Sequence, residues 1–218
     1  MKIVFSKIFF VSISLLFSSH VFAASWNDQQ TIYPNNNGPW GDWFTYTCPT
    51  GKYVNSFVMT VESNQGRGDD TAANRLALRC TYPGTSSSVV LNAFPNDSNY
   101  APWGSWGSWR LCDAGGEAYL GLQIKVEPNQ KSGDDTALNA SRFLCAHTSS
   151  GGLYEDNPFA YWQDMSNPGP WGSWSNYVGF TNKSSGYRLC GVRVRIEKRQ
   201  GRGDDTAGNS IAGIFCGI

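Results

Sequence analysis

The chain has 218 residues, a formal net charge of zero and only 16% charged residues, with 9 tryptophans and 10 tyrosines. This neutrality gives no electrostatic reason to expect nucleic acid or an anionic membrane as partner. The aromatic and glycine content excludes a disordered chain and favours a β-rich globule.

The first 23 residues have the features of a secretory signal peptide. Lys2 and Lys7 form a basic start before a largely apolar run over residues 8–17, and Val21-Phe22-Ala23 fits the small-residue rule for cleavage. We expect cleavage after Ala23, which leaves residues 24–218 as one secreted domain with 15 Lys and Arg against 17 Asp and Glu, a net charge of −2. Neither this run nor any later one is long enough for a transmembrane helix.

Two sequence signatures recur three times in the same order. Trp-Gly-x-Trp occurs at 40–43 and 171–174, and in a stuttered form within 103–109. Gly-Asp-Asp-Thr-Ala-x-Asn ends at Asn74, Asn139 and Asn209, and each copy follows a glutamate at a fixed distance. Such repetition predicts one domain of three similar units, at roughly 38–85, 86–150 and 160–218.

Each unit contains an alternating stretch that predicts a strand with one face on the core. In unit two the inward row is expected to begin at Leu120 and continue through Leu122, Ile124 and Val126. In unit three it begins at Cys190. The acidic run follows as a turn, because Gly tolerates positive φ and Asp, Thr and Asn bond to nearby backbone groups.

A second strand then returns to the closing cysteine of each unit. Unit three has one residue more before Cys216, which makes Gly213 a candidate β-bulge. Residues 89–94 predict a further strand, and nothing after the signal peptide has a helical period. The fold class is therefore all-β. Three equivalent sheets can close around a pseudo-threefold axis as a prism, while a sandwich or small barrel stays open on composition alone.

Six cysteines follow the signal peptide, and an even number in an exported chain indicates disulfides. One cysteine precedes and one follows each acidic run, which predicts Cys48–Cys80, Cys112–Cys145 and Cys190–Cys216. Zinc is the alternative, but the chain has no Cys-x-x-Cys and no paired histidines. We predict no metal and no cofactor.

Taken together, the units of Trp-Gly-x-Trp, Cys, Val-Glu, Gly-Asp-Asp-Thr-Ala-x-Asn and Cys resemble the vitelline membrane outer layer protein I family. The resemblance covers residues 38–216, and 133–139 is its most specific run. It implies a β-prism of three Greek-key sheets around a pseudo-threefold axis, with secretion and disulfides within the units. It also implies a non-catalytic component of an extracellular layer, with a link to chito-oligosaccharides.

The repeated carboxylates are the first candidate for chemistry or sugar contact. They are Glu62, Asp69, Asp70, Glu127, Asp134, Asp135, Glu197, Asp204 and Asp205. A glycosidase needs two carboxylates about 5–10 Å apart, and a calcium-type cation would also take such oxygens. Because catalysis needs only one such pair, the triplication favours a structural role as turn caps.

The tryptophans are the second candidate, because flat apolar rings suit sugar stacking. A tryptophan that recurs with the repeat is more often part of the core or a lid over the end of the prism, and we favour that interpretation. Trp26, Trp103 and Trp162 fall outside the repeat and are expected to be the more exposed ones, so Trp103 is a candidate sugar contact.

The sequence therefore predicts a secreted monomer that acts as a structural or carbohydrate-binding component of an extracellular layer. Its partners would be layer proteins or glycans. The alternatives are a glycan-active enzyme that uses one acidic set, and a lectin-like or toxin-type carbohydrate-binding module. With one histidine after the signal peptide and no free cysteine expected, triad-type hydrolysis is close to excluded.

Overall fold

The structure is a computed structural model that describes residues 26, 28–63, 73–100, 103–112, 118–129, 137–146, 160–180, 186–200 and 206–217. These residues form 14 β-strands in three antiparallel sheets, which confirms the all-β class. A helix long and apolar enough to cross a membrane is not found among them. The predicted signal segment, residues 1–23, lies outside the described residues.

The hairpin of each repeat supplies the two long central strands of one sheet. Sheet 1 contains β3 (Tyr53–Val61), β4 (Ala73–Thr81), β5 (Ser88–Asn92), β6 (Ser105–Trp106) and β7 (Arg110–Leu111). Sheet 2 contains β8 (Ala118–Val126), β9 (Leu138–Ala146), β10 (Tyr161–Asp164), β11 (Ser173–Trp174) and β12 (Val178–Gly179). Sheet 3 contains β13 (Arg188–Ile196), β14 (Gly208–Cys216), β1 (Gln29–Ile32) and β2 (Asp42–Thr47).

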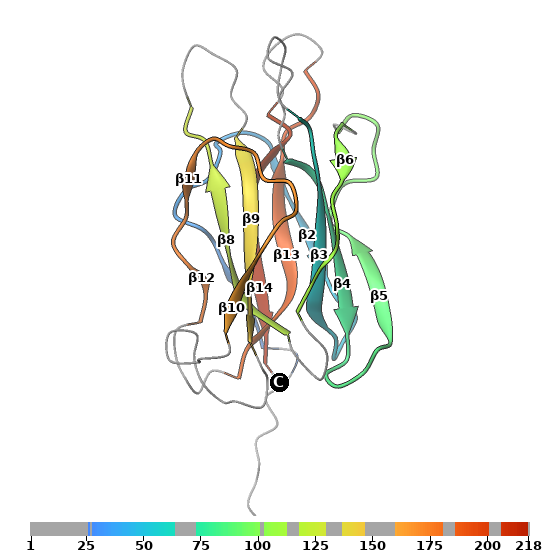
Figure 1. The fold of residues 1–218 in the computed structure, drawn as a ribbon. Coiled ribbons are helices and arrows are strands. Elements are labelled where there is room, and N and C mark those ends of the chain that lie inside the picture. The colour runs from blue at the N-terminus through green and yellow to red at the C-terminus, as the bar shows by residue number, and fades with distance from the viewer. Residues whose placement is uncertain are drawn as a thin grey trace, which may run out of the picture.

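Each sheet has the strand order of a Greek key, as the family resemblance implied. In sheet 1 the strands β3, β4 and β5 lie side by side, and the chain then returns to place β6 and β7 beside β3. Sheet 2 repeats this order with β8 to β12. In sheet 3 the N-terminal strands β1 and β2 take the two outer places, beside β14 and β13. The prism is thus closed by pairing of the N-terminal segment with the C-terminal hairpin (Figure 1).

The sheets are therefore offset from the sequence repeats. The hairpin of one repeat is completed by the opening segment of the next one, so that β6 and β7 join sheet 1 and β11 and β12 join sheet 2. The central strands β3, β8 and β13 contact one another, which brings the three sheets together around one axis.

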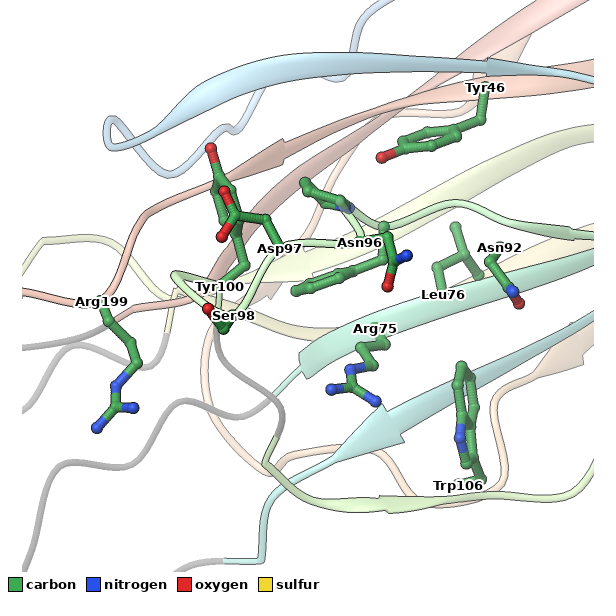
Figure 2. Close-up of a pocket in the computed structure, with 12 residues that line it drawn as sticks. Tyr46, Arg75, Leu76, Asn92, Asn96, Asp97, Ser98, Tyr100, Trp106 and Arg199 are labelled. Carbon is green, nitrogen blue, oxygen red and sulfur yellow. The ribbon is translucent and has the colours of Figure 1, made fainter.

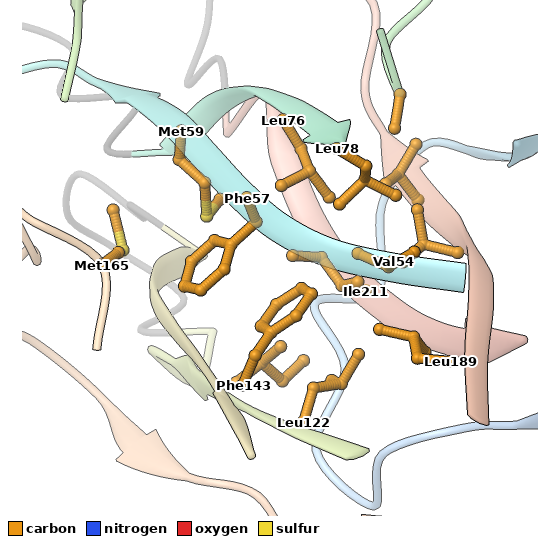
Figure 3. Close-up of a cluster of buried hydrophobic side chains, with 14 of the residues drawn as sticks. Val54, Phe57, Met59, Leu76, Leu78, Leu122, Phe143, Met165, Leu189 and Ile211 are labelled. Atoms are coloured by element: carbon orange, nitrogen blue, oxygen red, sulfur yellow. The ribbon is translucent and has the colours of Figure 1, made fainter. Parts of the chain in front are cut away.

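The core lies between the inner faces of the three sheets. Phe57 of sheet 1 stacks on Phe143 of sheet 2 with ring centroids 4.1 Å apart, and Tyr119 meets both rings edge-on. Leu189 and Ile211 bring sheet 3 into the same cluster (Figure 3). All five of these side chains are buried, so apolar burial from all three sheets drives closure of the prism.

Two β-bulges recur at equivalent places in every hairpin. The extra residue on the first strand is Asn55, Leu120 or Cys190, and on the return strand it is the motif asparagine. The bulge in unit two corrects our prediction for Leu120. Leu120 is half-buried. The preceding residue, Tyr119, is fully buried and takes the inward place that was predicted for Leu120. One inserted residue exchanges the two faces of a strand.

The variable position before each motif asparagine lies where the three sheets converge. A Cβ added to Gly208 would be 2.3 Å from the Ala73 carbonyl oxygen and 3.5 Å from Leu138 Cδ2. Ala73, Leu138 and Gly208 are the equivalent residues of the three repeats. Because the Leu138 side chain fills this point, there is no room for a large side chain at position 73 or 208.

The three predicted disulfides are present, but they hold different parts of the fold together. Cys48 follows β2 of sheet 3 and binds Cys80 of sheet 1, while Cys112 follows β7 of sheet 1 and binds Cys145 of sheet 2. These two disulfides therefore connect neighbouring sheets. Cys190–Cys216 instead joins the two strands of one hairpin.

The remaining junction, between sheets 2 and 3, is filled by two phenylalanines. Phe180 follows β12 as Cys112 follows β7, and Phe215 aligns with Cys145 in the strand register. Their ring centroids lie 5.6 Å apart in an edge-on contact. The predicted bulge at Gly213 was wrong, since that residue pairs in register. A Cβ there would come within 2.5 Å of the Phe215 ring, so glycine makes room for this ring.

Candidate functional site

The glutamate of the acidic repeat closes a turn in the third unit. The Glu197 carboxylate accepts hydrogen bonds from the Thr206 hydroxyl at 2.6 Å and from the Thr206 amide at 3.3 Å. Its other oxygen accepts one from the Gln200 amide at 2.8 Å. Asn209 in turn donates to the Thr206 hydroxyl at 2.7 Å. The motif residues therefore satisfy one another across the ends of the hairpin.

The backbone of this turn is the same in units two and three. The amides of Glu127 and Glu197 each donate to the alanine carbonyl of the motif at 2.8 Å. These alanines, Ala137 and Ala207, have φ values of 43° and 48°, in the left-handed region that costs a non-glycine residue energy. Glu62 lies at the corresponding end of β3. The predicted Asp69, Asp70, Asp134, Asp135, Asp204 and Asp205 lie outside the described residues.

The glycine of Trp-Gly-x-Trp lets the opening segment of each repeat approach the preceding hairpin. Gly41, Gly104 and Gly172 have φ values of 83°, 81° and 85°. A Cβ at any of them would be 2.2–2.4 Å from the backbone at the end of β13, β3 or β8. Because Gly104 is the equivalent residue of unit two, its signature is 103–106, and Trp103 belongs to the repeat.

The second tryptophan of each signature lies beside the penultimate residue of a central strand. Trp43, Trp106 and Trp174 pair with Arg195, Thr60 and Lys125. Pairing in this register leaves Trp106 48% exposed and Trp174 37% exposed, whereas Trp26, Trp103 and Trp162 are half-buried. The expectation that Trp26, Trp103 and Trp162 would be the more exposed ones was therefore wrong, since the most exposed of the nine, Trp106, belongs to the repeat. None of the nine is fully buried, so the repeated tryptophans are not core residues, and their role as a lid over the end of the prism stays a prediction.

A groove of about 850 Å³ lies where sheet 3 meets sheet 1. One wall includes Tyr46 of the edge strand β2, and the other includes Arg75 of β4 and Asn92 of the edge strand β5 (Figure 2). Its full lining is Tyr46, Arg75, Leu76, Asn92, Phe94, Pro95, Asn96, Asp97, Ser98, Tyr100, Trp106 and Arg199. The groove thus combines four aromatic rings with amides, a carboxylate and two guanidinium groups.

The segment that follows β5 is held in a defined shape. The Asp97 carboxylate accepts from the Asn99 backbone amide at 2.9 Å and from its side-chain amide at 2.8 Å. The Tyr100 amide donates to the Asp97 carbonyl at 3.1 Å. The Tyr100 ring is buried and meets Phe44 edge-on with centroids 5.3 Å apart. This bonding fixes Asn96 and Asp97 at the groove before a ligand arrives.

The phenol of Tyr46 is half-buried in the wall of the groove. Burial raises the pKa of the Tyr46 phenol above its usual value, and the neighbouring Tyr100 raises it further. The Tyr46 hydroxyl therefore stays protonated at neutral pH and can donate or accept a hydrogen bond at the groove.

Among the sequence-predicted residues that the structure describes, Trp103 lies beside this groove, and the repeated Trp106 lines it. The Arg199 guanidinium lies over the Trp103 ring, 4.8 Å from the centroid. Sequence reasoning missed the other wall residues because it looked for what the repeats share. The signal that could have found them is a position at which one repeat differs from the other two. Arg75 is such a position, since the equivalent residues are Ala140 and Ser210.

Comparisons with known proteins agree with the sequence signatures. The family model for vitelline membrane outer layer protein I matches residues 90–217. The mouse protein named vitelline membrane outer layer protein 1 homolog is 37% identical over 183 residues, which cover 83% of this chain and 80% of that protein. The human homolog is 34% identical over 187 residues, which cover 85% of this chain and 81% of its own length.

Solved structures overlap more loosely. One of them is a mannose-specific jacalin-related lectin from Morus nigra, solved in complex with mannose. The alignment covers 86% of this chain and 93% of the lectin chain. The TM-score is 0.48 and the identity is 9%. So low a similarity gives no information on a shared ligand.

Proposed function

This chain belongs to the vitelline membrane outer layer protein I family, and we propose that it is a secreted, non-catalytic protein that binds carbohydrate in an extracellular layer. The groove between sheets 3 and 1 is the proposed binding site. The observation that supports this assignment is the combination of rings and amides along one open, preformed surface.

The groove has the chemical groups that a sugar requires. The rings of Tyr46, Phe94 and Trp106 offer apolar surface on which the C–H face of a pyranose can pack. The amides of Asn92 and Asn96 offer donors and acceptors for the hydroxyl groups of the ring. A concave site with apolar walls and a few polar groups is the usual form of a small-ligand site.

The carboxylates support a binding role over catalysis. Asp97 is the one carboxylate among the described wall residues, and two Asn99 groups already bond to it. Glycoside hydrolysis requires a second carboxylate across the bond. Glu197, the best-described member of the acidic sets, is engaged by Thr206 and Gln200 in its own turn.

Calorimetry of the mature chain with soluble oligosaccharides tests this proposal. The panel would contain N-acetylglucosamine oligomers and acidic oligosaccharides. We expect saturable heat with at least one ligand, and roughly tenfold weaker binding in Trp106→Ala, since a buried aromatic contact contributes 1 kcal/mol or more. Trp174→Ala is the matched control, because Trp174 occupies the equivalent place on sheet 2, away from the groove.

Mass spectrometry of the same mixtures distinguishes binding from catalysis. Unchanged oligosaccharide masses are expected. New chain lengths would revive the glycan-active alternative, and the absence of heat with every ligand, neutral or acidic, would contradict the carbohydrate-binding proposal.

A further inference from the structure

The pseudo-threefold symmetry of the prism is broken at the groove by its cations. In sheets 2 and 3 the penultimate residue of the central strand is a cation. It donates to the Trp-Gly-x-Trp segment that completes the sheet, which comes from the third repeat in sheet 2 and from the first repeat in sheet 3. Lys125 donates to the Pro170 carbonyl at 2.6 Å. Arg195 donates to the Gly41 carbonyl at 3.1 Å and to the Gly38 carbonyl at 3.0 Å. The equivalent residue of sheet 1 is Thr60, which carries no charge.

In sheet 1 a cation occurs instead on the neighbouring strand. Arg75 pairs with Thr60 on one side, as Trp106 does on the other. Its guanidinium lies over the Phe94 ring, 5.7 Å from the centroid. Among the described residues, no carboxylate forms an ion pair with it and no carbonyl accepts its hydrogen bonds. Arg75 thus lines the groove with donors that no described carboxylate or carbonyl engages, at the place where the other two sheets have Ala140 and Ser210.

The second cation comes from a departure in the third repeat. Arg199 follows Glu197 by two residues, at the place where unit two has Asn129. Its amide donates to the Asn99 carbonyl at 2.8 Å, which ties this turn to the wall segment. Its exposed guanidinium is stacked on Trp103. Figure 2 shows Arg199 at one end of the groove and Trp106 at the other, with Arg75 between them.

Two ring-supported guanidinium groups thus face one opening that has a single described carboxylate, Asp97. Guanidinium is a planar fork of donors that matches a carboxylate or a sulfate, and a ring beneath it limits the entropy lost on binding. From this geometry we infer that the ligand of the groove is an acidic oligosaccharide, with its rings on the aromatic wall and its anionic groups on Arg75 and Arg199. This inference rests on the carbohydrate-binding function proposed above.

The test compares three ligands of similar length by calorimetry. They are a neutral N-acetylglucosamine oligomer, a hyaluronan oligosaccharide that carries only carboxylates, and a chondroitin sulfate oligosaccharide that carries sulfates as well. We expect at least one acidic ligand to bind roughly tenfold or more tightly than the neutral one, with an affinity that falls as salt is raised. The stronger of the two identifies carboxylate or sulfate as the recognised group.

Arginine variants locate the effect in the groove. Arg75→Gln and Arg199→Gln should each weaken the acidic ligand about tenfold and leave the affinity for the neutral one nearly unchanged. Arg79→Gln is the matched control. Arg79 is on the same strand and is stacked on Trp109 with its guanidinium 4.7 Å from the ring centroid, but it does not line the groove. Arg199 is exposed, so its replacement leaves the core intact even if Arg75→Gln folds poorly.

The outcomes separate this inference from the function on which it rests. Equal affinity for neutral and acidic ligands would overturn the inference and leave carbohydrate binding in place. Acidic binding that Arg79→Gln weakens as much as Arg199→Gln does would also overturn it, since the attraction would then be a general surface effect. Failure of all three ligands to bind would overturn both proposals.

Discussion

Replacement of Phe180 and Phe215 by cysteine should create a fourth disulfide at the only sheet junction that lacks one. The two phenylalanines occupy the places of Cys112 and Cys145, and the corresponding Cα atoms are 5.3 Å apart in that disulfide and 5.7 Å apart in Cys48–Cys80. A separation in this range allows bonding without movement of the backbone. We therefore expect the double variant F180C/F215C to oxidise spontaneously during folding.

The stability change has two parts of opposite sign. Closing a loop of roughly 36 residues contributes about 3.8 kcal/mol in the chain-entropy model. Loss of the fully buried Phe215 ring costs about 3–5 kcal/mol. The oxidised variant should therefore not exceed the wild type in stability. The informative reference is F180S/F215S, which has the same missing rings and nearly the same side-chain size without the bond.

The oxidised cysteine variant should melt roughly 8–15 °C above the serine variant, given about 2–4 °C per kcal/mol for a chain of this size. Thiol titration of the unfolded protein counts free cysteines, of which the described chain has none. Peptide mapping then identifies the bond between positions 180 and 215. Two free thiols found by this titration in the double variant, or equal melting temperatures of the cysteine and serine variants, would refute the equivalence of the three junctions.

Three further changes test other parts of the fold. Gly208→Ala should cost about 1–3 kcal/mol in urea unfolding, because its Cβ would meet the Ala73 carbonyl at 2.3 Å; wild-type stability would contradict the convergence of the three repeats. Thr206→Val should cost about 1–3 kcal/mol in the same assay, because it leaves Glu197 and the buried Asn209 without their hydroxyl partner; a change below 0.5 kcal/mol, roughly the effect of an ordinary surface substitution, would argue against the turn role of the motif. Tyr46→Phe should reduce the loss of stability above pH 10.0: the raised pKa of Tyr46 keeps its proton in the folded state while the unfolded chain releases it, so its contribution is present below pH 10.0 and is lost as pH rises further. Identical pH profiles of urea unfolding for the variant and the wild type would refute this assignment.

The sequence by itself determined the repeat, the strands and the cysteine pairing. These features are local or are fixed by spacing. Period-two alternation identifies Leu122, Ile124 and Val126 as inward residues, and one cysteine on each side of every hairpin leaves few sensible pairings. The same local rules failed at Leu120, because alternation does not reveal where a single inserted residue exchanges the faces of a strand.

Only the tertiary structure decided which segment completes which sheet, and the groove depends on that choice. The opening segment of each repeat pairs with the preceding hairpin, so Trp106 lies across Thr60 from Arg75, although these residues belong to different repeats. The place of Arg199 beside Asn99 likewise depends on how sheets 3 and 1 meet. Three similar units have similar local preferences, so sequence patterns reveal their common fold. The departures that distinguish one face acquire a meaning only when closure of the prism brings them together.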